Sequence, residues 1–224
     1  MLNRAQYLQE LGIDVWVERG NEPLDPHQDS SSEFALDWEP LAARVSQCTA
    51  CDLHSSRSQT VFGVGDRQAE LLIIGEAPGA EEDKQGEPFV GRAGQLLNSM
   101  LRALGFERHE VFIANILKCR PPNNRDPKPA EVAACSGFLA RQIDLLSPRA
   151  ILAVGRIAAQ NLLQVETPIG KMRGKTYTYT SSSGGQEIPV IVTYHPAYLL
   201  RSPQEKGKVW LDLLAVKDML EQTE

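Results

Sequence analysis

The stretch LLIIGEAPGAEEDKQGEPFVGRAG, residues 71–94, starts as a strand and turns into an unusual loop. Leu71–Ile74 is a continuous apolar run, which is typical of a strand buried on both faces of a sheet. Gly75 ends the run, and the following residues are rich in glycine, proline and acidic side chains. A glycine loop after a strand usually holds a phosphate, but carboxylates oppose an anion, so this loop indicates a different ligand. The acidic residues nearest the strand are Glu76, Glu81, Glu82 and Asp83.

Strand, loop and helix alternate along the rest of the chain. Strands are predicted at Leu71–Ile74, Val111–Ile116 and Ala150–Val154, and as a hairpin at Tyr177–Thr180 and Ile188–Thr193. Helices are predicted at Trp38–Ser46, Ala93–Leu104, Pro129–Leu146 and Arg156–Leu163, and from Pro203 to Glu221. This alternation predicts the α/β class, a sandwich with a mostly parallel sheet.

Polar side chains follow several of the predicted strands. In open α/β sheets, ligands bind outside the carboxyl ends of the strands. Taken singly, an amide at such a position is explained as a loop cap and an imidazole as a buried structural histidine. An acid, an amide and an imidazole on one edge together favour a binding site. The strand ends are Gly75-Glu76, Asn115, Gly155-Arg156 and His195.

The composition describes a globular chain of 224 residues, of which 42% are hydrophobic. No apolar run approaches the roughly 20 residues that a membrane-spanning helix needs. The opening residues, MLNRAQYLQELGID, lack the apolar core of a signal peptide. We therefore expect a soluble, intracellular protein that is cytoplasmic and has no membrane partner.

The net charge of −6 is carried by the first 45 residues, which hold nine acidic and three basic side chains. The rest of the chain holds twenty of each sign, and its bases form local groups at 118–128, 171–175 and 201–208. Solvated surface residues explain any one group. A neutral domain with local basic stripes nevertheless binds a phosphate backbone, because screening makes such contacts local. Nucleic acid is therefore not excluded as a partner.

The charge also divides the chain into an acidic N-terminal extension and linker, residues 1–45, and a main domain, residues 46–224. Leu2–Glu18 has a helical pattern. Asn21–Ser32 is polar, with two prolines and a serine run, as linkers are. The role of the extension stays open between a regulatory arm, an arm for an unknown partner and a loosely attached segment.

Four cysteines occur in the chain, at Cys48, Cys51, Cys119 and Cys135. Intracellular proteins rarely pair cysteines as disulfides, and a C-x2-C pair places two thiolates close enough to share one metal. Two distant cysteines in loops complete four ligands, so structural zinc and a [4Fe–4S] cluster are both candidates. The separation of the last two slightly favours the cluster. Two unrelated buried pairs are the remaining explanation.

Four features together resemble the family 4 uracil-DNA glycosylases, which are iron–sulfur members of the uracil-DNA glycosylase superfamily. They are GEAPGAEEDKQGEPFVGRAGQLL, NILKCRPPNNRDP, HPAYLLR and the cysteine pattern, and the resemblance covers about residues 46–221. It implies a three-layer α/β/α sandwich around a central, mostly parallel four-stranded sheet. It also implies a structural [4Fe–4S] cluster on the four cysteines.

The reaction that the resemblance implies belongs to DNA repair. A monofunctional glycosylase hydrolyses the bond between uracil and deoxyribose in single- or double-stranded DNA, and leaves an abasic site. In a prokaryote such a protein is expected at the nucleoid. No covalent intermediate on Lys84 is expected.

The resemblance also suggests roles for residues around a flipped-out uracil. Phe89 is expected to stack on the ring, and Asn115 to donate to O4 and accept from N3–H. A neutral His195 is expected to donate to O2 as negative charge develops there. The remaining residues expected to face the uracil and the attacking water are Glu76, Ala77 and Gly79.

Contacts to DNA are expected from both basic and apolar side chains. The segment Ala197–Leu200 is expected to fill the gap left by the flipped base, with Tyr198 and Leu199 as the wedge. The alternative is a helix start that packs on the core. Phosphate contacts are expected from Arg120, Arg125, Arg173 and Arg201.

Two departures from the wider superfamily leave roles open. Ala77 stands where many relatives carry an aspartate that orients water. Gly79 stands where family 1 enzymes use a tyrosine against thymine, so another group is expected to block its methyl. The candidates for orienting water are Glu76 and Asn115, followed by Glu82 and Asp83.

Three rival functions remain at this stage. A superfamily variant that becomes covalently attached to DNA uses a histidine in an inserted loop, and the loop GAEEDKQGEPF contains none. A non-catalytic iron–sulfur DNA-binding protein would not need Phe89, Asn115 and His195 together. A metal-stabilised module for a nucleotide or small molecule would release no uracil from DNA.

Overall fold

The structure is a computed structural model that describes residues 37–182 and 184–221. These residues belong to one compact unit. The helix expected at Leu2–Glu18 and the linker expected at Asn21–Ser32 lie outside the described residues. Among the described residues, no helix is long and apolar enough to cross a membrane.

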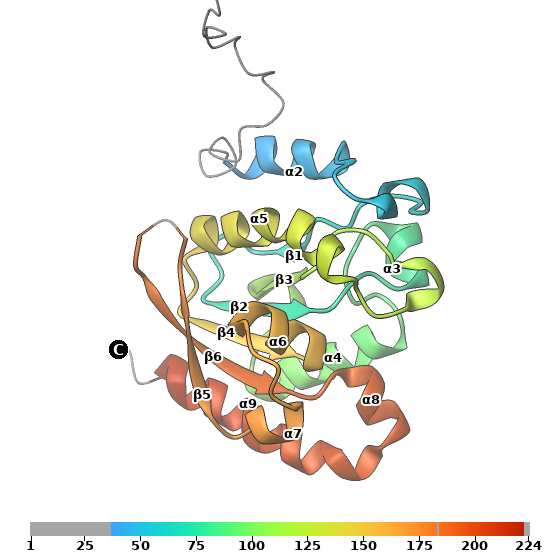
Figure 1. Cartoon of the computed structure of the whole chain (residues 1–224). Coiled ribbons are helices and arrows are strands. Elements are labelled where there is room, and N and C mark those ends of the chain that lie inside the picture. The colour runs from blue at the N-terminus through green and yellow to red at the C-terminus, as the bar shows by residue number, and fades with distance from the viewer. Residues whose placement is uncertain (1–36, 183, 222–224) are drawn as a thin grey trace, which may run out of the picture. The chain divides into compact units, whose positions relative to one another are not determined.

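A six-stranded sheet forms the centre of the unit (Figure 1), with the strand order β1-β3-β2-β4-β6-β5. The four inner strands are parallel, and β1 and β5 pair antiparallel at the two edges. The expectation of a mostly parallel sheet is confirmed, but the expected number of four strands describes only its inner part. The strands are β1 (Val64–Gly65), β2 (Leu71–Gly75), β3 (Phe112–Asn115), β4 (Ala150–Val154), β5 (Thr176–Thr180) and β6 (Glu187–Thr193).

Helices cover both faces of the sheet, which confirms the three-layer sandwich (Figure 1). Side chains of β2 alternate between the two faces, as a strand requires. Leu72 and Ile74 pack with α2, α5 and α6, whereas Leu71 and Ile73 pack with α4 and α9. The helices are α2 (Trp38–Ser46), α3 (Ala80–Gln85), α4 (Arg92–Leu104), α5 (Pro129–Leu146), α6 (Arg156–Leu163), α7 (Ile169–Met172), α8 (Pro196–Arg201) and α9 (Lys206–Glu221).

Helix α2 belongs to the compact unit, although most of it lies before the predicted boundary between residues 45 and 46. Its buried residues Trp38, Leu41 and Val45 lie in the cores that α5 also lines. The last helix begins at Lys206, after a 3-10 turn at Pro203–Glu205, and not at the proline itself. These differences leave the order of the elements as predicted.

Helix α3 was not expected, because its sequence AEEDKQ lies between glycines. Gly79 precedes its first turn, and Gly86 ends it in the left-handed conformation, with φ of 78°. Acidic side chains in the first turn interact favourably with the helix dipole. Part of the negative charge in the loop therefore serves this short helix.

An ion pair between Arg173 and Asp212 joins the segment after α7 to α9. Nε of Arg173 donates to Oδ2 of Asp212 at 2.7 Å, and the hydroxyl of Thr193 donates to the same oxygen at 2.6 Å. The guanidinium lies over the ring of Tyr194, 4.5 Å from its centroid. Only 10% of the Arg173 side chain and 1% of the Asp212 side chain are exposed. Arg173 is therefore engaged inside the fold, which argues against its expected phosphate contact.

Replacing Asp212 by alanine should destabilise the protein by about 3–5 kcal/mol, because it leaves the guanidinium of Arg173 buried without its partner. The free energy of unfolding in urea measures this loss. Glu39→Ala is the control, because its ion pair with Arg67 lies on the surface, where screening weakens it. Equal effects of the two substitutions would contradict the structural role of Asp212.

Candidate active site

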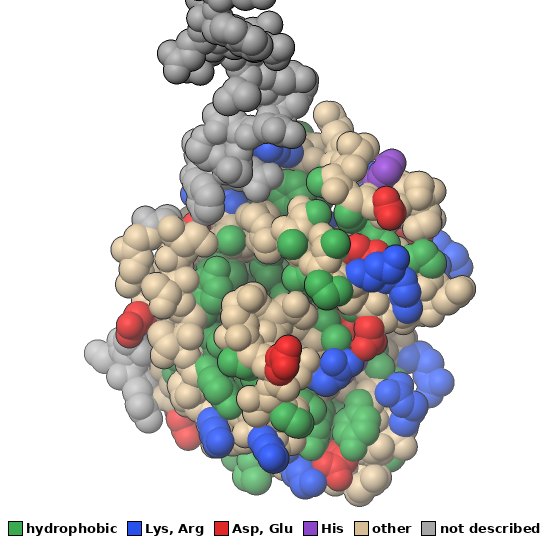
Figure 2. Space-filling view, in the orientation of Figure 1, with side chains coloured by type: hydrophobic (Ala, Val, Ile, Leu, Met, Phe, Trp, Pro, Cys, Tyr) green, Lys and Arg blue, Asp and Glu red, His purple; other side chains and the backbone are tan. Residues whose placement is uncertain are grey.

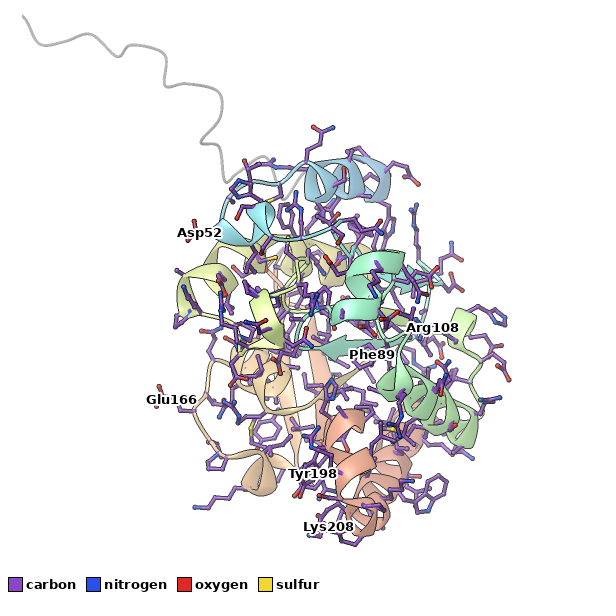
Figure 3. All side chains as sticks on the ribbon, turned by 90° about the vertical axis from the view of Figure 1, so that its right-hand side faces the viewer. Asp52, Phe89, Arg108, Glu166, Tyr198 and Lys208 are labelled. Carbon is purple, nitrogen blue, oxygen red and sulfur yellow. The ribbon has the colours of Figure 1, made fainter. Side chains whose placement is uncertain are left out.

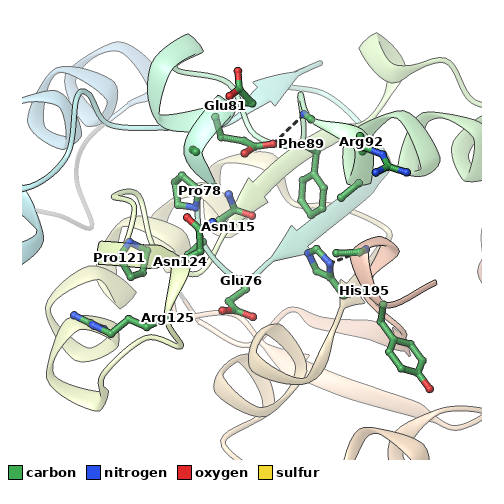
Figure 4. A pocket seen from close by; sticks show the side chains of 18 of the residues that line it. Glu76, Pro78, Glu81, Phe89, Arg92, Asn115, Pro121, Asn124, Arg125 and His195 are labelled. Carbon is green, nitrogen blue, oxygen red and sulfur yellow. Dashed lines mark hydrogen bonds between the residues drawn. The ribbon is translucent and has the colours of Figure 1, made fainter. Parts of the chain in front are cut away.

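A pocket of about 580 Å³ opens at the carboxyl ends of the parallel strands (Figure 4). Parallel pairing sets Gly75 of β2 opposite Asn115 of β3, and β4 and β6 end beside them. His195 follows β6 and starts α8. All the residues predicted to be catalytic or to bind substrate line this pocket: Glu76, Ala77, Gly79, Phe89, Asn115 and His195.

Phe89 and His195 form the flat part of the pocket wall. Their ring centroids lie 5.6 Å apart, and the rings are inclined by 27°. A Cβ atom on Gly75 would lie 2.6 Å from the Phe89 ring and 2.4 Å from Oδ1 of Asn115. Only a glycine at the end of β2 therefore lets both side chains approach the strand.

Asn115 brings an unpaired acceptor into the pocket. The residue is 2% exposed, and its Oδ1 is buried without a hydrogen-bond partner among the described residues. Leaving a buried carbonyl oxygen unpaired costs about 1–3 kcal/mol, so such an atom calls for an explanation. A ligand that offers an N–H group would supply the missing donor.

His195 is held as a neutral imidazole. Its Nδ1 accepts a hydrogen bond from the backbone N–H of Ala197 at 3.1 Å, so the ring proton of the neutral form resides on Nε2. The pKa of His195 is lowered to about 4, mainly by burial and also by the positive charge of Arg201, while Glu82 acts in the opposite direction. At neutral pH the residue is therefore an uncharged hydrogen-bond donor.

Glu76 is a half-buried acid at the end of β2. Its carboxylate makes no hydrogen bond to any side chain or amide in the described part of the chain. The pKa of Glu76 is raised to about 7, mainly by burial and also by the carboxylate of Asp126, while Arg156 acts in the opposite direction. Asp126 and Arg156 are themselves paired at 2.6 Å. Glu76 therefore exchanges a proton near neutral pH.

The other acids of the loop have different positions. Asp83 is buried and accepts from the backbone N–H of Ser58 at 2.9 Å, outside the pocket, so it is a poor candidate for orienting water. Glu81 also lines the pocket, but it is exposed and pairs with Lys84.

Glu82 is a pocket residue that the sequence did not single out for recognition of the base. Its Oε1 accepts from the backbone N–H groups of Val90 and Gly91, at 3.0 and 3.1 Å. A Cβ atom on Gly79 would lie 2.6 Å from Oε2. The carboxylate therefore occupies the space above Gly79, and two amides hold it there.

The residues expected to contact DNA fall into two groups. Arg125, Tyr198 and Arg201 line the pocket, and Figure 3 shows Tyr198 below Phe89 on the same face. Arg120 donates to Asn124 at 2.7 Å and does not line the pocket. Its expected contact with DNA stays a prediction.

Leu199 does not form the expected wedge. It is 1% exposed and packs in the core with α4 and α9, because α8 turns this face of the helix inward. The alternative explanation of a helix start that packs on the core is therefore correct for Leu199. Tyr198 and Leu200 stand out on either side of it, 36% and 39% exposed.

The four cysteines gather in one cluster beside α2 and α5. Cys119 and Cys135 are buried in it, and Cys48 and Cys51 pack against it. Cys135 lies on helix α5 and not in a loop. None of the four is paired in a disulfide. Among the described residues, no group of three or more His, Cys, Asp or Glu side chains forms a ready metal-ion site.

Nitrogen donors accompany two of the thiols. Nη1 of Arg57 donates to Sγ of Cys119 at 3.1 Å, and the backbone N–H of Lys118 donates to Sγ of Cys135 at 3.3 Å. Burial raises the pKa of Cys135 to about 11 and also raises that of Cys119. Four thiols in one place, with positive groups beside them, fit an inorganic centre that binds thiolates.

Lys118 was grouped with the surface bases, but it is fully buried. Its Nζ donates to the carbonyl of Asn115 at 3.0 Å and to Oε1 of Gln142 at 2.5 Å. The pKa of Lys118 is lowered to about 8, mainly by burial, while its proximity to the Cys135 sulfur acts in the opposite direction. Nothing in the local sequence pattern distinguishes this lysine from its exposed neighbours.

The pKa of Glu76 should fall when Asp126 is replaced by asparagine, because one negative charge that opposes ionisation is removed. Arg156→Gln should raise it, because a stabilising positive charge is lost. Titration of the Glu76 carboxyl carbon by ¹³C NMR measures both shifts. Shifts of the same sign in the two variants would contradict this electrostatic account.

The comparisons with known proteins agree with this geometry. The model of the uracil DNA glycosylase superfamily matches residues 62–214. A type-4 uracil-DNA glycosylase of Archaeoglobus fulgidus is 46% identical over 81% of this chain and 92% of its own length. Those of Pyrobaculum aerophilum and Thermotoga maritima are 43% and 46% identical, over 80% and 73% of this chain and 92% and 83% of their own lengths. The chain therefore belongs to the uracil-DNA glycosylase superfamily, and within it to the type-4 family.

Proposed function

We propose that the protein excises uracil from DNA by hydrolysing its bond to deoxyribose, as a monofunctional repair enzyme inside the cell. The observation that carries the proposal is the buried, unpaired Oδ1 of Asn115 in one pocket with the rings of Phe89 and His195. A base within a duplex is out of reach of such a pocket, so the nucleotide is flipped out, at a cost of about a few kcal/mol.

Asn115 reads the edge of the uracil, while Phe89 stacks on its face. Oδ1 accepts from N3–H, and the amide NH2 donates to O4. Cytosine has a bare N3 and an amino group at position 4, so it would leave both ends of the amide unpaired. Hydrogen-bonded sites of this type discriminate by factors of roughly 10⁴ or more.

His195 stabilises the leaving uracil anion. The bond to Ala197 keeps the proton on Nε2, and the low pKa keeps the ring neutral, so the proton is donated as a hydrogen bond to O2 and not transferred in the ground state. A preorganised donor aimed at developing negative charge lowers the barrier by about 3–4 kcal/mol.

Glu76 serves the sugar side of the reaction. In its ionised form the carboxylate orients the attacking water and stabilises the positive charge that develops on the sugar. A pKa of about 7 provides the ionised form near neutral pH. Many relatives in the wider superfamily carry an aspartate that orients water where this chain has Ala77. In this chain the neighbouring Glu76 takes that role.

Glu82 excludes thymine. Its Oε2 lies above Gly79, where no side chain occupies the wall, and the amides of Val90 and Gly91 prevent it from swinging away. A 5-methyl group against this oxygen would clash with it and remove it from water.

DNA approaches the face that carries the pocket. Figure 2 shows Lys and Arg side chains along the right-hand edge of the view, on the side where Figure 1 places α3 and α8. Arg201 at the pocket grips the phosphates. Arg125 also lines the pocket, but its guanidinium donates to both carboxylate oxygens of Glu131, at 2.9 and 2.5 Å, which argues against its expected phosphate contact as it does for Arg173. Tyr198 and Leu200 fill the gap in the stack, in place of Leu199.

Cys48, Cys51, Cys119 and Cys135 hold the expected [4Fe–4S] cluster. When bound, this group supplies a rigid cross-link between the segment after α2, the loop after β3 and helix α5. Phe89, Asn115 and His195 lie outside the cysteine cluster, whereas Ala77 lines the pocket and also packs against the cluster.

Purified protein should release uracil from single-stranded and U:G duplex oligonucleotides, which then break at the abasic site in alkali. Asn115→Ala and His195→Ala should lower the rate by at least about a hundredfold, through loss of base reading and of charge stabilisation. Arg67→Ala, at an exposed ion pair away from the pocket, is the control. Intact strands with the unaltered protein would refute the proposed function.

Glu82→Ala should admit thymine, because it opens the space above Gly79. Release of thymine from a T:G oligonucleotide should become measurable, while uracil is still released. Glu81→Ala, which removes an exposed carboxylate one position earlier on α3, should release no thymine. A Glu82→Ala enzyme that excises uracil and still rejects thymine would contradict this assignment.

A further inference from the structure

Lys118 is a positive side chain that the core encloses almost completely, with 1% of its surface exposed. Burying an ammonium group is unfavourable unless negative groups and hydrogen-bond acceptors compensate it. No ion pair between Lys118 and a carboxylate occurs in the described part of the chain. The cysteine cluster is the neighbouring site at which negative charge would be placed, because bound thiols are thiolates.

The same residue contacts both the cysteine cluster and the strand end in the pocket. Its backbone N–H donates to Sγ of Cys135 at 3.3 Å. Its Nζ donates to the carbonyl of Asn115 at 3.0 Å and to Oε1 of Gln142 at 2.5 Å. Gln142 is itself anchored, since its Nε2 donates to the carbonyl of Phe62 at 2.9 Å. Lys118 therefore contacts both a cysteine of the cluster and the backbone of Asn115, whose side-chain amide lines the pocket.

We propose that Lys118 is a positioning residue that couples the thiolate-bound centre to Asn115. The negative centre compensates the buried ammonium, and the ammonium in turn holds the end of β3 so that the Asn115 amide faces the base. This inference rests on the proposed reading of uracil by Asn115. It assigns the centre an effect on recognition that is exerted through one side chain.

Two consequences distinguish this role from ordinary packing. A positive charge beside the centre favours its more negative, reduced form, so loss of the charge should shift the reduction potential to more negative values. Loss of the hydrogen bond to the Asn115 carbonyl should loosen the amide that reads uracil. The turnover number should then fall more than the affinity for DNA, because phosphate contacts are unaffected.

The experiment compares Lys118→Met with Lys217→Met in protein that carries the reconstituted centre. Lys217 is exposed on α9, so its replacement removes the same charge from the surface. Lys118→Met should shift the reduction potential negatively, lower kcat for uracil by about tenfold or more and change KM by less than about threefold. Lys217→Met should change none of these. An unshifted potential, or a lower kcat without a shift in potential, would overturn the proposal.

Two further variants keep the test decisive if Lys118→Met does not fold. Lys118→Gln keeps a donor near the Asn115 carbonyl but removes the charge. It should therefore shift the reduction potential as much as Lys118→Met does, but lower kcat less. Gln142→Glu gives the ammonium a carboxylate partner, so removal of iron should lower Tm less than in the unaltered protein. An equal or larger loss of Tm would count against the coupling.

The coupling through Lys118 can be tested even if the proposed function is wrong. If the unaltered protein releases no uracil, the reduction potential and the NMR resonances of the Asn115 side-chain amide still report on the coupling. Both should change in Lys118→Met, and neither should change in Lys217→Met. Unchanged amide resonances in Lys118→Met would overturn the positioning role.

Discussion

The parallel pairing of Gly75 with Asn115 is the constraint on which the pocket depends. It places an amide and an acid at the ends of two adjacent strands, and the ring of Phe89 packs against them only because Gly75 carries no side chain. β4 and β6 continue the same register, so the residue after β6 reaches the same opening. The chemistry of the site is therefore a consequence of how four strand ends align.

The chemical division of labour follows from different surroundings of two titratable groups. His195 caps α8 and stays uncharged, whereas Glu76 lies near Asp126 and takes up a proton near neutral pH. Neither property belongs to the residue type, since each arises from burial and from the charges nearby. The same pocket can therefore stabilise an anion on one side and a cation on the other.

Much of the fold and most of the pocket were predictable, because strand ends and helix caps have local signatures. Helices α2, α5 and α6 begin and end where the pattern places them, and Phe89, Asn115 and His195 share one pocket as the resemblance implies. The predictions that failed concern side chains whose positions depend on packing between segments far apart in the sequence. Leu199 faces the core and Arg173 pairs with Asp212, because α9 lies against both. No local pattern reports such a partner.

The order of the cysteines along the chain has a consequence for how the protein is made. All four lie between residues 48 and 135, so a nascent chain carries the complete thiol set before β4, β6 and His195 have been synthesised. The proposed cluster would thus cross-link the half of the sheet that bears Asn115 before the other half has been synthesised. His195 would then be the last of the three residues to join the pocket, after Phe89 and Asn115.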